Sequence, residues 1–187
     1  MKKIVVFASG NGSNFQNIAD TISKDNNIQI ALLICNKQDA FVLQRAEKMN
    51  IPSMLISKES FYQSENVLNV LKTLNPDLIV LAGFLWLIPE NIIDAFDRKI
   101  INIHPALLPK YGGKGMYGMH VHRAVAENKE TESGISVHYV SKEYDAGDLI
   151  FQAKCNLSTS DTPEVIANKI HKLEYDYFPK IISNLLT

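Results

Sequence analysis

An asparagine and a histidine two positions apart are the most chemically informative pair in this sequence. Asn102 and His104 lie at the end of the apolar run Lys99 to Ile103, which predicts a buried β-strand, and Pro105 ends its ladder. Because alternate side chains of a strand point to opposite faces, both residues emerge on one face. An amide donor beside an imidazole suits a reaction in which a carbonyl oxygen becomes negative while a proton moves. The alternative is a capped strand end, since Asn and His before Pro are common turn residues.

A glycine-rich turn joins the first predicted strand, Lys3 to Ala8, to a predicted helix over residues 14–23. The turn, Ser9-Gly10-Asn11-Gly12-Ser13-Asn14, places backbone N–H groups at a helix N-terminus, where they and the helix dipole favour a phosphate. Phe15 stands where the third glycine of a dinucleotide fingerprint would be, and no Gly-Lys-Ser follows, so NAD and ATP are disfavoured. The alternative is a tight turn that needs glycine only for its backbone conformation.

Several other polar residues have open roles. Asp145 precedes Ala-Gly in a loop between two late strands, where it is either a turn residue or a distant partner of His104. In the second case, the carboxylate would favour the protonated imidazole and fix its orientation. His120 and His122 form an H-x-H pair, but no further ligand stands at a suitable spacing, so we predict no metal site. His138 lies in a predicted strand and either lines the site or belongs to the core.

The order of apolar runs predicts how these residues are positioned. Strand patterns occur at 3–8, 29–35, 53–56 and 78–82, and helical patterns at 14–23, 40–49 and 65–74. These strands are apolar throughout, which is typical of parallel strands covered on both faces by crossover helices. After His104 we expect a loop over 105–118, a helix over 120–127, paired strands at 134–140 and 149–156, and a final helix that begins at Thr162. The predicted fold is α/β, a doubly wound, mostly parallel sheet with an antiparallel C-terminal strand pair, flanked by helices, in a single domain over 1–187.

The bulk properties restrict the class of protein. The 187 residues suit one domain, and a formal net charge of -1 gives no basic surface for nucleic acid or an anionic membrane. No apolar stretch approaches the roughly 18 residues that a membrane span requires, and no charged-then-apolar signal precedes the first strand. Cys35 and Cys155 have no metal-type spacing and lie in or beside apolar runs, so we expect reduced thiols and a cytoplasmic protein.

Four motifs together resemble those of one known family. They are Ser9-Gly10-Asn11-Gly12-Ser13-Asn14, Leu81-Ala82-Gly83-Phe84, Asn102-Ile103-His104-Pro105-Ala106-Leu107-Leu108-Pro109 and Asp145-Ala146-Gly147. They are similar to those of the folate-dependent formyltransferases, and the glycine-rich turn is more particular to the branch that formylates phosphoribosylglycinamide in purine synthesis. The likeness runs nearly end to end. It implies a doubly wound α/β fold and an enzyme that acts on glycinamide ribonucleotide and 10-formyltetrahydrofolate. Our hypothesis for the mechanism is direct transfer of the formyl group to the amine, through an oxyanion intermediate and without a metal.

The resemblance also implies three sets of site residues, for catalysis, for substrate binding and for binding of the folate cosubstrate. The catalytic set is Asn102, His104 and Asp145. The substrate-binding set combines a phosphate turn with a carboxylate on the last helix: Gly12, Ser13, Asn14 and Glu174. The set that helps enclose the pterin ring is Leu85, Trp86, Leu87 and Ile88, with the loop over 141–147 as the opposite wall. The local sequence alone indicates a solvated charge at Glu174.

Two features depart from the family pattern. Ser60 stands where the family often has an arginine or a similar cation near the folate tail, although Lys58 is nearby. The loop Tyr111 to Met119 is longer than the usual family loop by about five residues and is either a mobile cover or a tolerated surface insertion.

Three alternatives to this function can be named. Methionyl-tRNA formyltransferases normally add a C-terminal RNA-contacting domain and formyltetrahydrofolate deformylases an N-terminal regulatory domain, so the length argues against both. A non-catalytic nucleotide-binding module would use only the turn Gly10 to Asn14. That alternative would leave Asn102 and His104 without a role.

Overall fold

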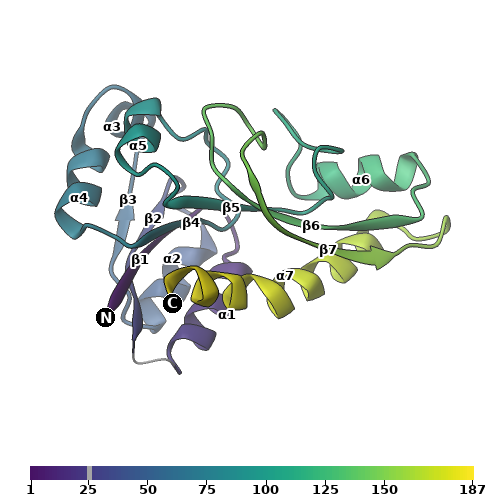
Figure 1. Cartoon of the computed structure of the whole chain (residues 1–187), viewed down its shortest axis with the longest axis horizontal. Coiled ribbons are helices and arrows are strands. Elements are labelled where there is room, and N and C mark those ends of the chain that lie inside the picture. The colour runs from purple at the N-terminus through teal and green to yellow at the C-terminus, as the bar shows by residue number, and fades with distance from the viewer. Residues whose placement is uncertain (25–26) are drawn as a thin grey trace.

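The computed structural model describes residues 1–24 and 27–187, which form one mixed sheet with helices on both faces (Figure 1). The strands are β1 (Lys2–Ala8), β2 (Ile28–Cys35), β3 (Ser53–Leu55), β4 (Leu78–Leu81), β5 (Ile100–His104), β6 (Glu132–Tyr139) and β7 (Leu149–Asn156). The helices are α1 (Ser13–Ile22), α2 (Phe41–Lys48), α3 (Lys58–Tyr62), α4 (Asn66–Leu74), α5 (Glu90–Ala95), α6 (Met119–Glu127) and α7 (Pro163–Leu186).

The strand order confirms the predicted topology. It is β3-β2-β1-β4-β5-β6-β7, with parallel pairing from β3 through to β5 and antiparallel pairing of β6 with both β5 and β7. The chain builds outward from β1 to β3 on one side and then returns to add β4 on the other. Open α/β sheets bind ligands outside the carboxyl ends of the strands at such a reversal. The fold therefore predicts a site beside the ends of β1 and β4.

Successive residues of the central strands face two hydrophobic layers. In β1, Ile4 and Val6 belong to one layer and Val5 and Phe7 to the other, and all four are fully buried. The first layer is completed by α1, α2, α6 and α7, and the second by α3, α4 and α5. Burial on both faces explains why these strands lack the polar alternation of a half-exposed sheet.

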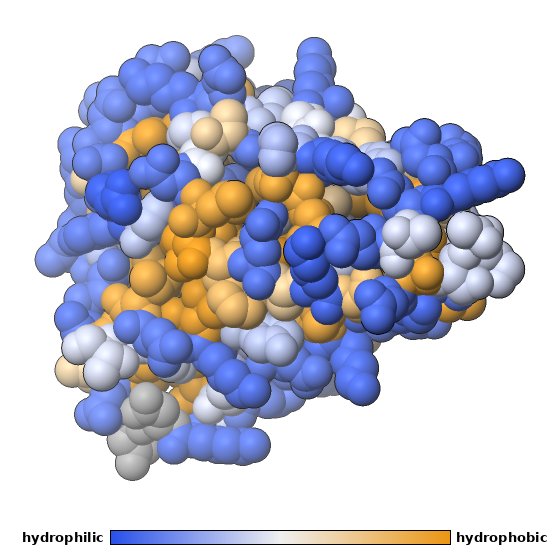
Figure 2. All heavy atoms as spheres, turned by 45° about the vertical axis from the view of Figure 1, so that its right-hand side comes forward, coloured by the Kyte–Doolittle hydropathy of each residue, from blue (hydrophilic) through white to orange (hydrophobic). Residues whose placement is uncertain are grey.

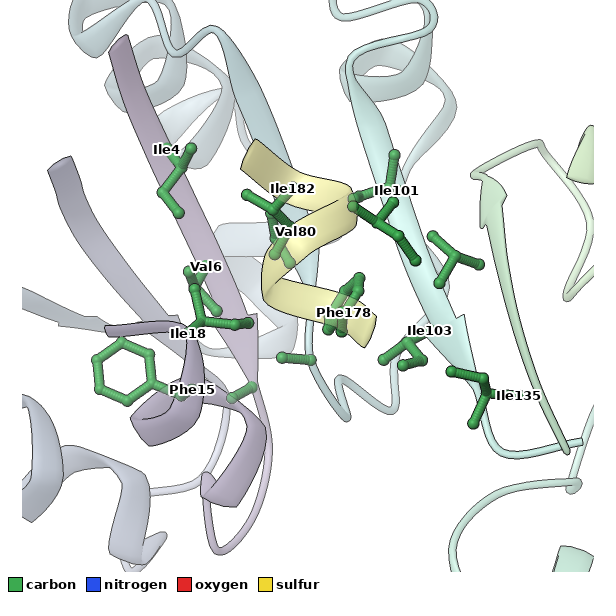
Figure 3. Packing of buried hydrophobic residues seen from close by; sticks show 14 of the residues in the cluster. Ile4, Val6, Phe15, Ile18, Val80, Ile101, Ile103, Ile135, Phe178 and Ile182 are labelled. Carbon is green, nitrogen blue, oxygen red and sulfur yellow. The ribbon is translucent and has the colours of Figure 1, made fainter. Parts of the chain in front are cut away.

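The last helix crosses the first layer. Thr162 caps α7, its hydroxyl accepting a hydrogen bond from the N–H of Val165, and Pro163 occupies the first turn, as predicted. Phe178 and Ile182 of α7 pack with side chains from β1, β4, β5, β6 and α1 (Figure 3). None of the helices in the described part of the chain combines the length and apolar character needed to span a bilayer.

The short helices α3 and α5 were not predicted. They contain five and six residues, too few for an apolar stripe of period 3.6 to be recognised. Ser57 and Ser60 form a reciprocal capping box at the start of α3, with serine where glutamate or glutamine is usual. The ends of the predicted strands and helices agree with the structure to within two residues.

Candidate active site

A cavity of about 710 Å³ opens along the carboxyl ends of β1, β4 and β5. This volume is typical of small-molecule sites, and the place is the reversal in strand order. Every residue of the three predicted sets lines this cavity. Figure 2 shows apolar residues gathered in the middle of one face of the molecule, with hydrophilic side chains around them.

The glycine-rich turn begins α1 without a side-chain cap. Gly12 is the N-cap residue, with φ of 77°, and as a glycine it has no side chain that could accept a hydrogen bond from the first turn. A Cβ at Gly12 would lie 2.4 Å from Cγ2 of Val42, so the turn needs glycine for space as well as for conformation. An uncapped helix N-terminus that faces a cavity presents N–H groups to an anion.

The turn is joined to the last helix by a partly buried hydrogen bond. Asn14 Nδ2 donates to Glu174 Oε2 at 2.9 Å, and the Glu174 residue is only 6% exposed. The solvated charge that the local sequence indicated is therefore wrong, because α7 turns this carboxylate into the cavity. Burial raises the pKa of Glu174 by more than the hydrogen bond from Asn14 and the charge of His171 lower it.

The catalytic set meets at one carboxylate. Asn102 and His104 lie at the end of β5, and Asp145 lies on the loop between β6 and β7. Asn102 Nδ2 lies 3.4 Å from Oδ1 of Asp145, and His104 Nδ1 lies 3.5 Å from Oδ2. Asp145 has a left-handed backbone, with φ of 54°, which is typical of a turn. It is thus both a turn residue and a partner of His104.

The protonation of His104 reflects opposing effects. Its Nε2 lies 2.7 Å from the carbonyl oxygen of Tyr111, and since a carbonyl only accepts, Nε2 carries a proton. Burial lowers the pKa of His104 by more than Asp145 and the Tyr111 carbonyl raise it. The expected effect of Asp145 has the right direction, but burial outweighs it. The pKa of Asp145 is also lowered, because His138, His104 and the N–H of Gly113 outweigh the opposing effect of burial, so Asp145 stays ionised.

His138 is a member of the site whose role the sequence left open. It lies opposite Asn102 in the antiparallel pair of β5 and β6 and is 2% exposed. Its Nδ1 donates to the carbonyl of Tyr139 at 2.8 Å, and its Nε2 lies 3.1 Å from Asn102 Nδ2 and 3.6 Å from Asp145 Oδ1. The signal for this residue is the strand register, which the sequence alone does not give.

The apolar side of the cavity is built on an aromatic cluster. Trp86 contacts the rings of Phe61, Tyr62 and Phe84, with centroids 5.9, 6.0 and 6.2 Å away. The unpredicted helix α3 supplies two of these rings, and the hydroxyl of Tyr62 donates to the carbonyl of Leu87 at 2.9 Å. Residues of the predicted opposite wall also line the cavity; they are Ser141, Glu143, Tyr144 and Asp145.

A further feature of the cavity is a buried histidine of α6. His122 is 2% exposed, and burial, with smaller effects of His171 and His104, lowers its pKa to about 4. Its Nδ1 is buried without a hydrogen-bond partner among the described residues. Within 1–24 and 27–187, no three His, Cys, Asp or Glu side chains are grouped closely enough to hold a metal ion.

Residues 113–118 line the cavity, so the long loop forms part of its wall.

Ser60 has a structural role that accounts for its position. Its hydroxyl accepts a hydrogen bond from the N–H of Ser57 at 3.0 Å, within the cap of α3. Ser60 does not line the cavity.

The doubly wound sheet, with the glycine-rich turn and the catalytic set at its strand ends, is typical of a class of group-transfer enzymes. Comparison of the sequence with models of known protein families identifies this class. The chain belongs to the formyl transferase family, whose sequence model matches residues 2–182.

Its relatives include phosphoribosylglycinamide formyltransferases. The protein of that name from Bacillus subtilis (strain 168) is 39% identical over 191 residues, which cover 100% of this chain and 95% of the relative. The chloroplastic one from Arabidopsis thaliana is 37% identical over 187 residues, which cover 97% of this chain but 64% of the relative. The crystal structure of glycinamide ribonucleotide transformylase 1 from Geobacillus kaustophilus has a TM-score of 0.89 and 33% identity and covers 100% of both chains.

Proposed function

We propose that this protein is a phosphoribosylglycinamide formyltransferase of purine biosynthesis. It would transfer the formyl group of 10-formyltetrahydrofolate to the amine of glycinamide ribonucleotide. The observation that carries the proposal is the convergence of Asn102 and His104 on Asp145, inside the cavity that also contains the glycine-rich turn. Two relatives that bear this enzyme's name support it, because each alignment covers 100% of this chain.

The cavity offers a separate place for each part of the two substrates. The phosphate would bind to the N–H groups of the turn over Gly12, Ser13 and Asn14. The buried carboxylate of Glu174, beside that turn, would contact the polar body of the same substrate. Because β4 separates β1 from β5, these two strands lie two strand spacings apart, about 10 Å, which would leave room for the ribose and the glycinamide.

The folate cosubstrate would bind at the apolar side. A flat pterin ring suits the segment over Leu85, Trp86, Leu87 and Ile88, because this segment and residues of the loop over 141–147 both line the cavity. Ser60 supplies no cation for the folate tail, so we expect this tail to be held less specifically than the ring.

The catalytic set would act on the oxygen that becomes negative as the amine attacks the formyl carbon. Asn102 Nδ2 and His104 Nδ1 would donate to that oxyanion in place of their 3.4 and 3.5 Å contacts with Asp145, which are longer than each residue's other contact. The negative charge would raise the pKa of His104 and so oppose the effect of burial. Asp145 would orient both donors before the attack. As the intermediate collapses, the C–N bond to the folate would break, and the amine proton would pass through water near Asp145 to the departing folate nitrogen.

The acceptor distinguishes this function from its alternatives. The test is an absorbance assay for folate release with glycinamide ribonucleotide, methionyl-tRNA or water alone as acceptor. We expect release only with glycinamide ribonucleotide. Release with water would indicate a deformylase, and tight binding of a ribose phosphate without any transfer would indicate a non-catalytic binding module.

We also propose that the reaction needs no metal. Protein treated with EDTA should retain its activity with glycinamide ribonucleotide. Complete loss that Zn²⁺ restores would contradict the proposal. That the protein binds no nucleic acid and is cytoplasmic stays a prediction from its charge and composition.

A further inference from the structure

Two backbone groups at the start of the long loop contact the histidine and aspartate pair, one for each member. The carbonyl oxygen of Tyr111 lies 2.7 Å from His104 Nε2, and the N–H of Gly113 donates to Asp145 Oδ2 at 2.9 Å. The same oxygen of Asp145 faces His104 Nδ1 at 3.5 Å. The backbone over 111–113 and these two side chains therefore close a ring of contacts.

We propose that Tyr111 is a positioning residue, which together with Gly113 holds His104 and Asp145 in one relative orientation and keeps the Nε2 proton in place. His104 Nδ1 is then the nitrogen that meets the substrate. The catalytic meaning of this arrangement rests on the proposed function, but the arrangement itself does not. We call residues 111–113 the clamp.

The conformation of Tyr111 shows that its surroundings hold it. Its φ is 56°, in the left-handed region that costs an L-residue other than glycine free energy. Such a conformation persists where neighbouring contacts determine it, and these residues cluster at functional sites. Here the left-handed backbone turns the carbonyl of Tyr111 toward His104.

The side chain of Tyr111 supplies the contacts that fix this conformation. Its hydroxyl donates to Glu130 Oε1 at 2.9 Å and accepts from Asn128 Nδ2 at 2.9 Å. Both partners lie just beyond the C-terminal end of α6, and the ring packs against the first hydrophobic layer. The tyrosine thus connects the clamp to the segment that follows α6, a helix of the core.

The middle residue of the clamp lies against the aspartate. A Cβ at Gly112 would come within 2.5 Å of Leu108 Cδ2 and 3.3 Å of Asp145 Cβ. The absence of a side chain at this position lets the backbone approach Asp145 closely enough for the hydrogen bond from Gly113.

The clamp determines which nitrogen of His104 is free to react. The Tyr111 carbonyl can only accept, so the neutral ring carries its proton on Nε2 and presents the Nδ1 lone pair to Asp145. A second proton then enters at Nδ1, beside the carboxylate. The other titratable groups that act on this ring are His138 of β6 and His122 of α6.

The test compares two variants of Tyr111 with a matched control. Tyr111→Phe keeps the ring and loses the hydroxyl contacts, whereas Tyr111→Val also disfavours the left-handed backbone, because its side chain is β-branched. Tyr177→Phe, at a 37% exposed tyrosine of α7 that does not line the cavity, is the control. Nitrogen-15 NMR of the full chain reports the His104 tautomer without any substrate, with a His104→Gln sample to assign the signal.

We expect the neutral ring of wild-type His104 to be the Nε2–H tautomer alone and that of Tyr111→Val to be a mixture. The value of kcat should fall about tenfold in Tyr111→Phe and about a hundredfold in Tyr111→Val, with each KM within about threefold. Because the Tyr111 carbonyl raises the pKa of His104, its loss lowers that pKa. The alkaline limb of the kcat profile, where protonated His104 is lost, should therefore move to lower pH.

Wild-type tautomer and kcat in Tyr111→Val would overturn the proposal. Activity lost in both variants without any change of tautomer would also overturn it, because the role would then be structural only. If Tyr111→Val does not fold, Tyr111→Phe decides by the same two measurements. If Tyr111→Val changes the tautomer but the wild-type protein does not formylate glycinamide ribonucleotide, the role of the clamp is supported and the proposed function is wrong.

Discussion

The side chains of Asn14 and Glu174 are hydrogen-bonded at 2.9 Å, although 160 positions separate them in the sequence. This contact joins the turn after β1 to α7, so the first and last helices close one side of the cavity together. The raised pKa of Glu174 means that the folded chain holds the carboxyl proton more tightly than the unfolded chain does. Stability from this group is therefore present below its usual pKa and is lost as pH rises through the raised value.

Replacing Glu174 by a neutral residue should make the fold more stable and weaken the binding of glycinamide ribonucleotide. We expect Glu174→Gln to unfold at a higher urea concentration than the wild type at pH 8 and to raise the KM for glycinamide ribonucleotide at least about tenfold. Asp176→Asn, at an exposed position of the same helix, is the control and should change neither value. Equal stability of Glu174→Gln and wild type at pH 8 would contradict the raised pKa.

Asn102 should contribute mainly to the rate. Its amide nitrogen, which lies near Asp145, is one of the two donors proposed for the oxyanion, and removal of one oxyanion donor typically costs roughly 3 kcal/mol. Asn102→Ala should therefore lower kcat by about two to three powers of ten and change each KM less. Steady-state kinetics with Asn69→Ala, an exposed asparagine of α4, as control provide the measurement. A kcat close to that of the wild type would exclude Asn102 as an oxyanion donor.

The two glycines of the phosphate turn should respond differently to a methyl group. At Gly12 the new Cβ would lie 2.4 Å from Val42 and the φ of 77° would be strained, whereas nothing lies within 4 Å of a Cβ at Gly10. We expect Gly12→Ala to lose affinity for glycinamide ribonucleotide, measured by calorimetry, and Gly10→Ala to fold with wild-type stability. Unchanged affinity in Gly12→Ala would show that the phosphate binds elsewhere.

His122 should make the fold sensitive to acid. Burial lowers its pKa from the usual 6.5 to about 4, so the unfolded chain takes up this proton more readily than the folded chain. Stability is then lost as pH falls from about 6.5 toward about 4, by as much as about 3 kcal/mol. The lowered pKa of His104 acts in the same direction.

Urea denaturation between pH 4.5 and pH 7.5 checks this expectation. The free energy of unfolding of His122→Gln should depend less on pH over this interval than that of the wild type. His120→Gln replaces the exposed histidine of the same helix and should keep the wild-type dependence. The same slope in all three proteins would show that His122 does not titrate as its burial requires.

Most of the fold could be predicted because its signals are local. The β1 run is apolar on both faces, which is typical of a buried parallel strand. The glycine-rich residues after it mark the turn that leads into α1. By contrast, α3 and α5 are too short for helical periodicity, and their positions depend on packing against the second layer.

The site was predictable where residues are close in sequence and less so where pairing brings them together. Asn102 and His104 follow from strand alternation, whereas the approach of Asp145 depends on the pairing of β6 with β5 and β7. His138 enters the site only through that register. The lowered pKa of His104 depends on its burial, which no local pattern gives.

Trp86 is the single tryptophan of the chain, and it lies in the cavity wall among three other aromatic rings. All tryptophan fluorescence of this protein therefore originates beside the place proposed for the pterin ring. Ligand occupancy can be followed by emission intensity alone, without a label, because no second indole contributes a background.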